Sequence, residues 1–172
     1  NPIDWKTALA GRFDGLLLPG GHAPRVRPYI ESIDLQQKTA EMLEAGRPVA
    51  AICHGVLVAA RAMGSDGESA LHRRRTTALP KSMELSAWAA TCVWLGDYYR
   101  TYPQTVEDEV TDVLDHVSQF DPGPRSLRRD SAQDLSPGFI VRDGNWLSAR
   151  WPGDAHRFAS EFLKMLADQR GA

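Results

Sequence analysis

The segment Ala50-Ala51-Ile52-Cys53-His54-Gly55 constrains the fold most, because it joins a buried strand to a helix through one sharp turn. Residues 49–52 are too short and too uniformly apolar for a surface strand, and residues 54–63 continue as a helix up to Gly64. A reactive side chain between a strand and a helix, followed by a glycine that relieves crowding, is typical of a nucleophile elbow. We therefore interpret Cys53 as a nucleophile in an α/β domain.

Pro19-Gly20-Gly21-His22 ends a second buried strand over residues 13–18. Functional groups of α/β sheets gather at the carboxyl ends of strands, so this turn and Cys53 should lie together. The helix N-terminus behind Cys53 favours thiolate over thiol, and the His54 N–H offers one oxyanion donor. Gly21, through which the backbone can approach a substrate, offers a second donor. The competing interpretation is that Cys53 is a small buried apolar residue.

The remaining pattern alternates helices and strands. A helix over residues 34–45 ends at Gly46, a strand over residues 76–79 is closed by Pro80, and residues 102–129 read as loops with one strand at most. A β-hairpin over residues 139–149 precedes a closing helix with its apolar face on Ala155, Phe158, Ala159, Phe162, Leu163 and Leu166. This order predicts a largely parallel sheet covered on both faces.

Residues 83–99 form the clearest amphipathic pattern of the chain. Its apolar positions recur at steps of three and four at Leu85, Trp88, Cys92, Leu95 and Tyr99. Because Cys92 lies on that face, we interpret it as a core residue rather than a reactive thiol.

Composition narrows the class of partner. With 172 residues the chain has the length of one domain, and its net charge of −2 gives no basic field for nucleic acid. No apolar run approaches the roughly 18 residues that cross a bilayer, and the first residues do not resemble a signal peptide. Two distant cysteines make no disulfide framework, so a cytoplasmic location is the simplest expectation. No metal-ligand spacing is present, and thiol chemistry needs no cofactor.

Leu17-Leu18-Pro19-Gly20-Gly21-His22-Ala23-Pro24 and Ala51-Ile52-Cys53-His54-Gly55 resemble the two signature turns of the ThiJ/PfpI superfamily. The likeness continues through residues 77–81 and 148–154 to the last helix. It implies one class I glutamine amidotransferase-like domain over residues 1–172, a flavodoxin-like three-layer sandwich that forms dimers or larger oligomers. It also implies that Cys53 is the nucleophile, His54 its acid–base partner, and the Gly21 and His54 amides the oxyanion hole.

Three departures from the family pattern limit what is carried over. Family members begin with a strand and helix bearing a glutamate that contacts the cysteine, so we expect the full protein to be longer at its N-terminus. The late His-x-Glu pair of glutaminases is absent, which argues against glutamine hydrolysis. Lys81 follows Leu79-Pro80 where one branch has an acid. Glu84 is then the nearest carboxylate, and either orients His54 or is an ordinary first-turn glutamate.

Five further side chains are candidates for substrate contact. His22, Arg25 and Arg27 follow the Gly-Gly turn and suit an anionic or carbonyl substrate, and Arg150-Trp151 is a candidate pocket wall. The resulting hypothesis is a cysteine-dependent hydrolase or lyase for a small carbonyl or amide-like substrate, of the glyoxalase or deglycase kind. Isonitrile hydratase, peptidase, redox or stress sensor and chaperone-like scaffold remain open alternatives.

Overall fold

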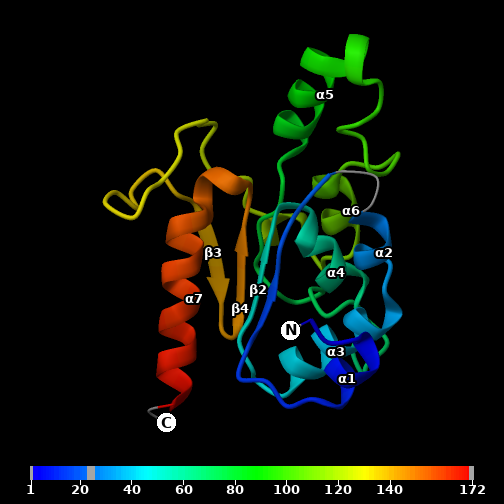
Figure 1. Ribbon diagram of the computed structural model, residues 1–172, viewed down its shortest axis with the longest axis vertical. Coiled ribbons are helices and arrows are strands. Elements are labelled where there is room, and N and C mark those ends of the chain that lie inside the picture. The colour runs from blue at the N-terminus through cyan, green and yellow to red at the C-terminus, as the bar shows by residue number, and fades with distance from the viewer. Residues whose placement is uncertain (1, 23–25, 171–172) are drawn as a thin grey trace.

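The architecture is built on a four-stranded sheet, and two neighbouring strands of it end at the predicted turns. A computed structural model describes residues 2–22 and 26–170, so Arg25 lies outside the described residues (Figure 1). The strands are β1 (Leu16–Leu18), β2 (Val49–Ile52), β3 (Ile140–Asp143) and β4 (Trp146–Ala149), in the spatial order β1-β2-β4-β3. β1, β2 and β4 run parallel, and β3 pairs antiparallel with β4. The mostly parallel sheet is therefore confirmed.

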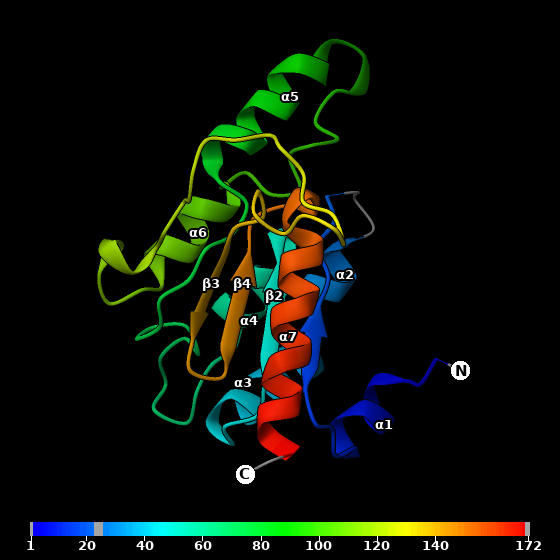
Figure 2. The same cartoon turned by 90° about the vertical axis from the view of Figure 1, so that its left-hand side faces the viewer.

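Helices cover both faces of this sheet. α7 (Ala155–Arg170) lies on one face, while α3 (Ile33–Glu44) and α4 (Val56–Arg61) lie on the other, as Figures 1 and 2 show. Alternation along β2 divides its side chains between two apolar clusters: Val49 and Ala51 belong to the α3–α4 cluster, and Ala50 to the α7 cluster. The predicted three-layer arrangement is present.

The remaining helical segments lie between these elements or before them along the chain. They are α1 (Trp5–Ala10), α2 (Arg27–Ile30), α5 (Lys81–Leu95), α6 (Val106–Asp112) and the 3-10 turns Cys53–Gly55, Val117–Gln119 and Pro152–Asp154. Within the described ranges, no helix is both long enough and apolar enough to pass through a membrane.

The C-terminal hairpin and helix form where the sequence predicts them. Gly144 has a positive φ of 59° in the two-residue turn between β3 and β4, which suits a glycine. On α7, Phe158 and Phe162 are buried as expected, but Leu163 is 66% exposed. The helix packs only one narrow stripe on the sheet, so the predicted apolar face was too wide.

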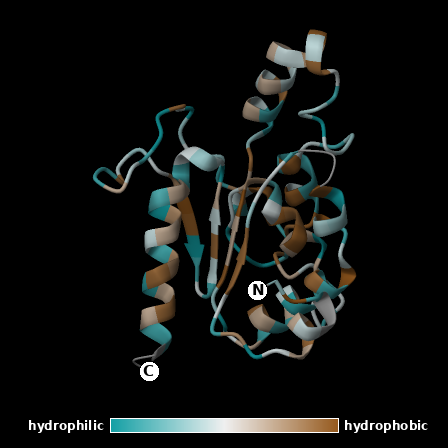
Figure 3. Cartoon of the chain, viewed as in Figure 1, coloured by the Kyte–Doolittle hydropathy of each residue, from teal (hydrophilic) through white to brown (hydrophobic). Residues whose placement is uncertain are grey.

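The predicted helix over residues 83–99 forms as α5, but its expected burial is wrong. α5 extends away from the sheet (Figures 1 and 2), and Figure 3 shows that it carries apolar residues there. Val93 is 89% exposed and Trp94 69%, while Cys92 is only half-buried and is not a core residue. Periodicity identifies an apolar face but not the surface that covers it. The helix also ends early, because Gly96 turns the chain with a φ of 54°.

Residues 76–79 are not a strand, contrary to the sequence prediction. Thr76 forms only an isolated bridge with Phe120, and its buried hydroxyl instead donates to the Ser148 hydroxyl of β4 at 3.2 Å.

Residues 102–129 contain the unpredicted α6. Thr105 caps its N-terminus, and three acidic residues in its first turn suit the positive end of the helix.

Candidate active site

The turn that carries Cys53 is tight and strained. Cys53 has a φ of 59°, and among the described residues no other non-glycine residue has a positive φ. Such a conformation costs about 1–3 kcal/mol, so its surroundings must hold it in place. A β-carbon on Gly55 would clash with the Leu18 carbonyl oxygen and lie 2.6 Å from that of Pro19. One on Gly20 would lie 2.6 Å from Cys53 Cβ. Glycine at both positions lets the end of β1 touch the elbow.

Cys53 is buried, with 6% of its surface exposed. Burial raises the pKa of its thiol to about 12, and the nearby Glu84 carboxylate adds to that rise. Hydrogen bonds from the backbone N–H groups of His54 and Gly21 oppose it. Both backbone N–H groups therefore lie near enough to the sulfur to affect its pKa. The expected thiolate is not favoured, because burial outweighs the dipole of the six-residue α4.

His54 stands directly beside the nucleophile. Its Nδ1 lies 3.5 Å from Cys53 Sγ, and only 1% of the residue is exposed. Burial lowers the pKa of His54 to about 4, with charge repulsion from His22 as a second cause. A neutral thiol thus faces a neutral imidazole, which is the starting state for general-base catalysis. His54 Nε2 is buried without a hydrogen-bond partner among the described residues.

Glu84 comes from the first turn of α5 and reaches the same cavity. It is buried, and burial raises the pKa of its carboxyl group. Its Oε2 accepts a hydrogen bond from the Val106 N–H at 2.9 Å, so it caps the start of α6. Among the described residues, the Glu84 carboxylate makes this hydrogen bond and no hydrogen bond to His54. The sequence identified the carboxylate but not the partner it binds.

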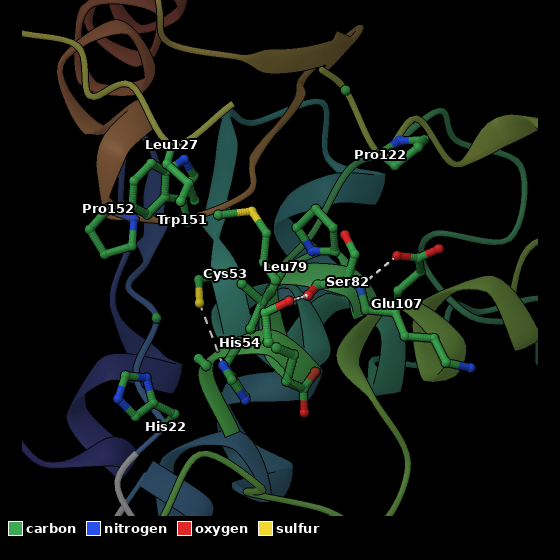
Figure 4. A pocket seen from close by; sticks show the side chains of 18 of the residues that line it. His22, Cys53, His54, Leu79, Ser82, Glu107, Pro122, Leu127, Trp151 and Pro152 are labelled. Atoms are coloured by element: carbon green, nitrogen blue, oxygen red, sulfur yellow. Dashed lines mark hydrogen bonds between the residues drawn. The ribbon is translucent and has the colours of Figure 1, made fainter. Parts of the chain in front are cut away.

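A cavity of about 1240 Å³ opens above Cys53 (Figure 4). Its walls come from the carboxyl ends of β1 and β2, the first turns of α5, the segment 122–127 and the start of the last helical region. Tyr99 and Glu107 complete the lining. The lining residues named from sequence are Gly20, Gly21, His22, Cys53, His54, Glu84 and Trp151. Gly55 lies beneath the elbow and supports it. The structure therefore brings together residues from distant parts of the sequence.

His22 is held by aromatic rings that the sequence analysis did not assign to the site. Its ring centroid lies 4.3 Å from that of Tyr99, 5.4 Å from that of Tyr98 and 6.3 Å from that of His54. The Thr101 hydroxyl donates to the His22 carbonyl oxygen at 3.1 Å. Gly96 was the available signal, because a glycine stop ahead of Tyr98 and Tyr99 takes them out of the helix and back toward the pocket.

Arg27 is a structural residue and not part of the cavity lining. Its guanidinium donates from Nε to the Thr101 carbonyl oxygen at 2.9 Å, which fixes the same returning segment.

Arg150 and Trp151 have different environments, although the sequence groups them. Trp151 lines the cavity. Arg150 is fully buried, pairs with Asp154 at 2.8 Å, and donates to the Pro124 carbonyl oxygen at 2.6 Å. Arg150 therefore anchors the segment 122–127, which forms part of the cavity wall. Across residues 2–22 and 26–170, no group of three or more His, Cys, Asp or Glu side chains could hold a metal ion.

An α/β sheet with a cysteine elbow at the carboxyl ends of its parallel strands defines a class of proteins built around a reactive thiol. The model of the DJ-1/PfpI family matches residues 3–165, and this chain belongs to that family. Curated relatives include a deglycase from Pyrococcus abyssi, 30% identical over 157 residues, and the deglycase PfpI from Pyrococcus furiosus, 29% identical over 157 residues. Each alignment covers 90% of this chain and 63% of the relative, so the chain spans less than two thirds of their length.

Solved structures share the fold. The structure described as APC35852 has a TM-score of 0.72 at 24% identity, covering 94% of this chain and 63% of that one. Glyoxalase III from Candida albicans has a TM-score of 0.64 at 19% identity, covering 89% of this chain and 57% of that one. These similarities show the flavodoxin-like fold expected from the sequence.

Proposed function

We propose that this chain carries the site of a cysteine-dependent hydrolase or lyase that acts on a carbonyl or amide-like substrate in the manner of a deglycase. The observation that carries the proposal is the 3.5 Å contact between Cys53 Sγ and His54 Nδ1. The backbone N–H groups of Gly21 and His54 lie close enough to the same sulfur to lower its pKa. The names of the deglycase relatives and of the glyoxalase III neighbour support the same reaction class.

The first step is proton transfer coupled to attack. His54 Nδ1 accepts the Cys53 thiol proton while the sulfur bonds to the substrate carbonyl carbon and the π electrons move to oxygen. The N–H groups of Gly21 and His54 stabilise the resulting oxyanion. The Cys53 thiol and the His54 imidazole are both neutral before the substrate binds, so the free site does not bear the cost of a buried charge.

Glu84 is included in the proposal as the carboxylate of the site. It is buried, lines the cavity and lies close enough to raise the pKa of Cys53. In this role it opposes premature ionisation of the thiol, so that deprotonation accompanies attack. Glu84→Gln is expected to increase the rate of Cys53 alkylation at neutral pH, because it removes that charge.

The test compares turnover of methylglyoxal, of a methylglyoxal-modified amine, of a simple amide and of an isonitrile by four proteins. These are the wild type, Cys53→Ser, His54→Gln and the matched control Cys92→Ser, which removes the other free thiol, outside the cavity. We expect at least a 100-fold loss in Cys53→Ser, a similar loss in His54→Gln and none in the control. Equal turnover by Cys53→Ser, or no wild-type turnover of any of these substrates, would refute the proposal.

We also propose that the chain forms a homodimer. Sedimentation equilibrium of the purified chain measures it directly, and a single species at the mass of one chain would contradict it.

A further inference from the structure

A second histidine of the cavity is not explained by the steps above. Both His22 and His54 line the cavity, at the ends of neighbouring parallel strands (Figure 4). In the part of the chain that the structure describes, neither ring nitrogen of His22 has a hydrogen-bond partner. In contrast, His72 Nδ1 lies 3.0 Å from the Val113 carbonyl oxygen and His116 Nδ1 lies 2.7 Å from the Ser118 hydroxyl. Aromatic neighbours therefore hold the His22 imidazole in place, while both of its ring nitrogens lack a hydrogen bond to the described protein groups.

The two imidazoles of the cavity differ in their access to water. His54 is 1% exposed and directs Nδ1 at the sulfur, so bulk water does not reach its ring. His22 is half-buried and faces the open cavity. Hydrolysis through a cysteine has two halves, and the second half needs a base that contacts a water molecule.

We propose that His22 is a second catalytic residue of this site, the general base that activates water against the acyl-Cys53 intermediate. The proposal rests on the proposed function, because it requires an acyl group on Cys53. Tyr98 and Tyr99 stack around the ring and Thr101 holds its backbone, so the imidazole is oriented before substrate binds.

The chemistry balances without any other reactant. In the first half, His54 takes the thiol proton and gives it to the leaving amine or alcohol as the bond to the carbonyl carbon breaks. In the second half, His22 takes a proton from water while the water oxygen bonds to the thioester carbon. The carbon–sulfur bond then breaks, and the sulfur takes up the proton held by His22. Acid and Cys53 thiol are the products.

Charge keeps the two roles separate. The ring centroids are 6.3 Å apart, so a proton on one imidazole disfavours a proton on the other. The titratable and charged groups facing His22 around the cavity are Cys53, His54, Lys81, Glu84, Tyr98, Tyr99, Glu107 and Arg125. Lys81 is paired with Asp108 at 2.8 Å, whereas a charge on His22 acts directly on His54 and lowers its pKa.

The experiment uses 4-nitrophenyl acetate, whose rapid burst reports acylation of Cys53 and whose steady phase reports hydrolysis of the thioester. For His22→Gln we expect a burst within threefold of wild type and steady turnover reduced about 100-fold. His54→Gln should lose the burst. His156→Gln, on the exposed face of α7, should change neither phase. Wild-type turnover should fall at acidic pH as His22 gains a proton, and this decrease should be absent in His22→Gln.

Rescue separates catalysis from structure. His22→Ala leaves space for a free imidazole, and added imidazole should restore the steady phase without changing the burst. If burst and turnover fall together in His22→Gln, or if its turnover equals that of wild type, the assignment of His22 is wrong. If wild type shows no burst, no acyl-Cys53 accumulates and the assignment of His22 is wrong. The proposed function fails separately, when wild type turns over none of the four substrates named above.

Discussion

Gly55→Ala tests whether the elbow depends on direct contact between β1 and the turn after β2. The new β-carbon would collide with two backbone carbonyl oxygens, those of Leu18 and Pro19. Neither can rotate aside as a side chain can, so the cost should lie at the upper end of about 1–3 kcal/mol for overpacking. Gly55 has helical dihedral angles, so alanine regains up to about 1 kcal/mol of helix propensity. The net destabilisation is about 2 kcal/mol.

Thermal unfolding monitored by circular dichroism measures this change. For a chain of this size 1 kcal/mol corresponds to roughly 2–4 °C, so Tm should fall by about 4–8 °C. Gly21→Ala is the matched control, because its nearest neighbour would be the Val26 Cγ2 atom at an ordinary 3.4 Å. That variant should stay within about 0.5 kcal/mol of wild type. If Gly55→Ala melts at or above the temperature of Gly21→Ala, the close-contact argument is refuted.

Three other predictions follow from burial and exposure. The alkylation rate of Cys53 by iodoacetamide should rise about tenfold per pH unit from pH 7 to pH 10, because its thiol pKa is about 12; a plateau near pH 9 would contradict this. Since the folded pKa exceeds that of a free thiol, this group's contribution to stability is present below pH 9 and is lost as pH rises toward 12. Arg150→Met should lower the free energy of unfolding by about 3–5 kcal/mol in urea titrations, because it leaves Asp154 buried without its cation; adding Asp154→Asn should recover part of that loss. Val93→Ser should change the free energy of unfolding by less than about 0.5 kcal/mol, and a larger loss would mean that α5 is covered in solution.

The parts of the site that were predictable are those encoded by local sequence. A short apolar strand, a cysteine and a glycine predict an elbow because few backbone paths join a strand to a helix so abruptly. Gly21 and His54 could be placed at the same end of the sheet, because backbone position follows from the two strand ends. His54 was adjacent in sequence, but only coordinates could direct its Nδ1 to the sulfur.

The parts that were not predictable depend on tertiary context. The apolar periodicity around Cys92 is real, yet α5 leaves the sheet and that face stays partly exposed. Thr76 has the β-branched character of a strand, but its hydroxyl donates to the Ser148 side chain of β4 and its backbone forms only an isolated bridge with Phe120. Tyr99 was assigned to a helix face, whereas Gly96 returns it to the cavity. Each error assigns a correct local pattern to the wrong surroundings.

Burial of the thiol bears on whether this cysteine serves catalysis or redox sensing. Sensor cysteines are accessible and have a low pKa, because the thiolate is the form that peroxide oxidises. Cys53 is buried with a thiol pKa of about 12, and the adjacent His54 is neutral near pH 7. In the mechanism proposed above, the thiol proton moves to His54 only when an electrophile enters the cavity and is attacked. The environment therefore favours a nucleophile activated by its substrate, and it predicts slow oxidation by hydrogen peroxide at neutral pH.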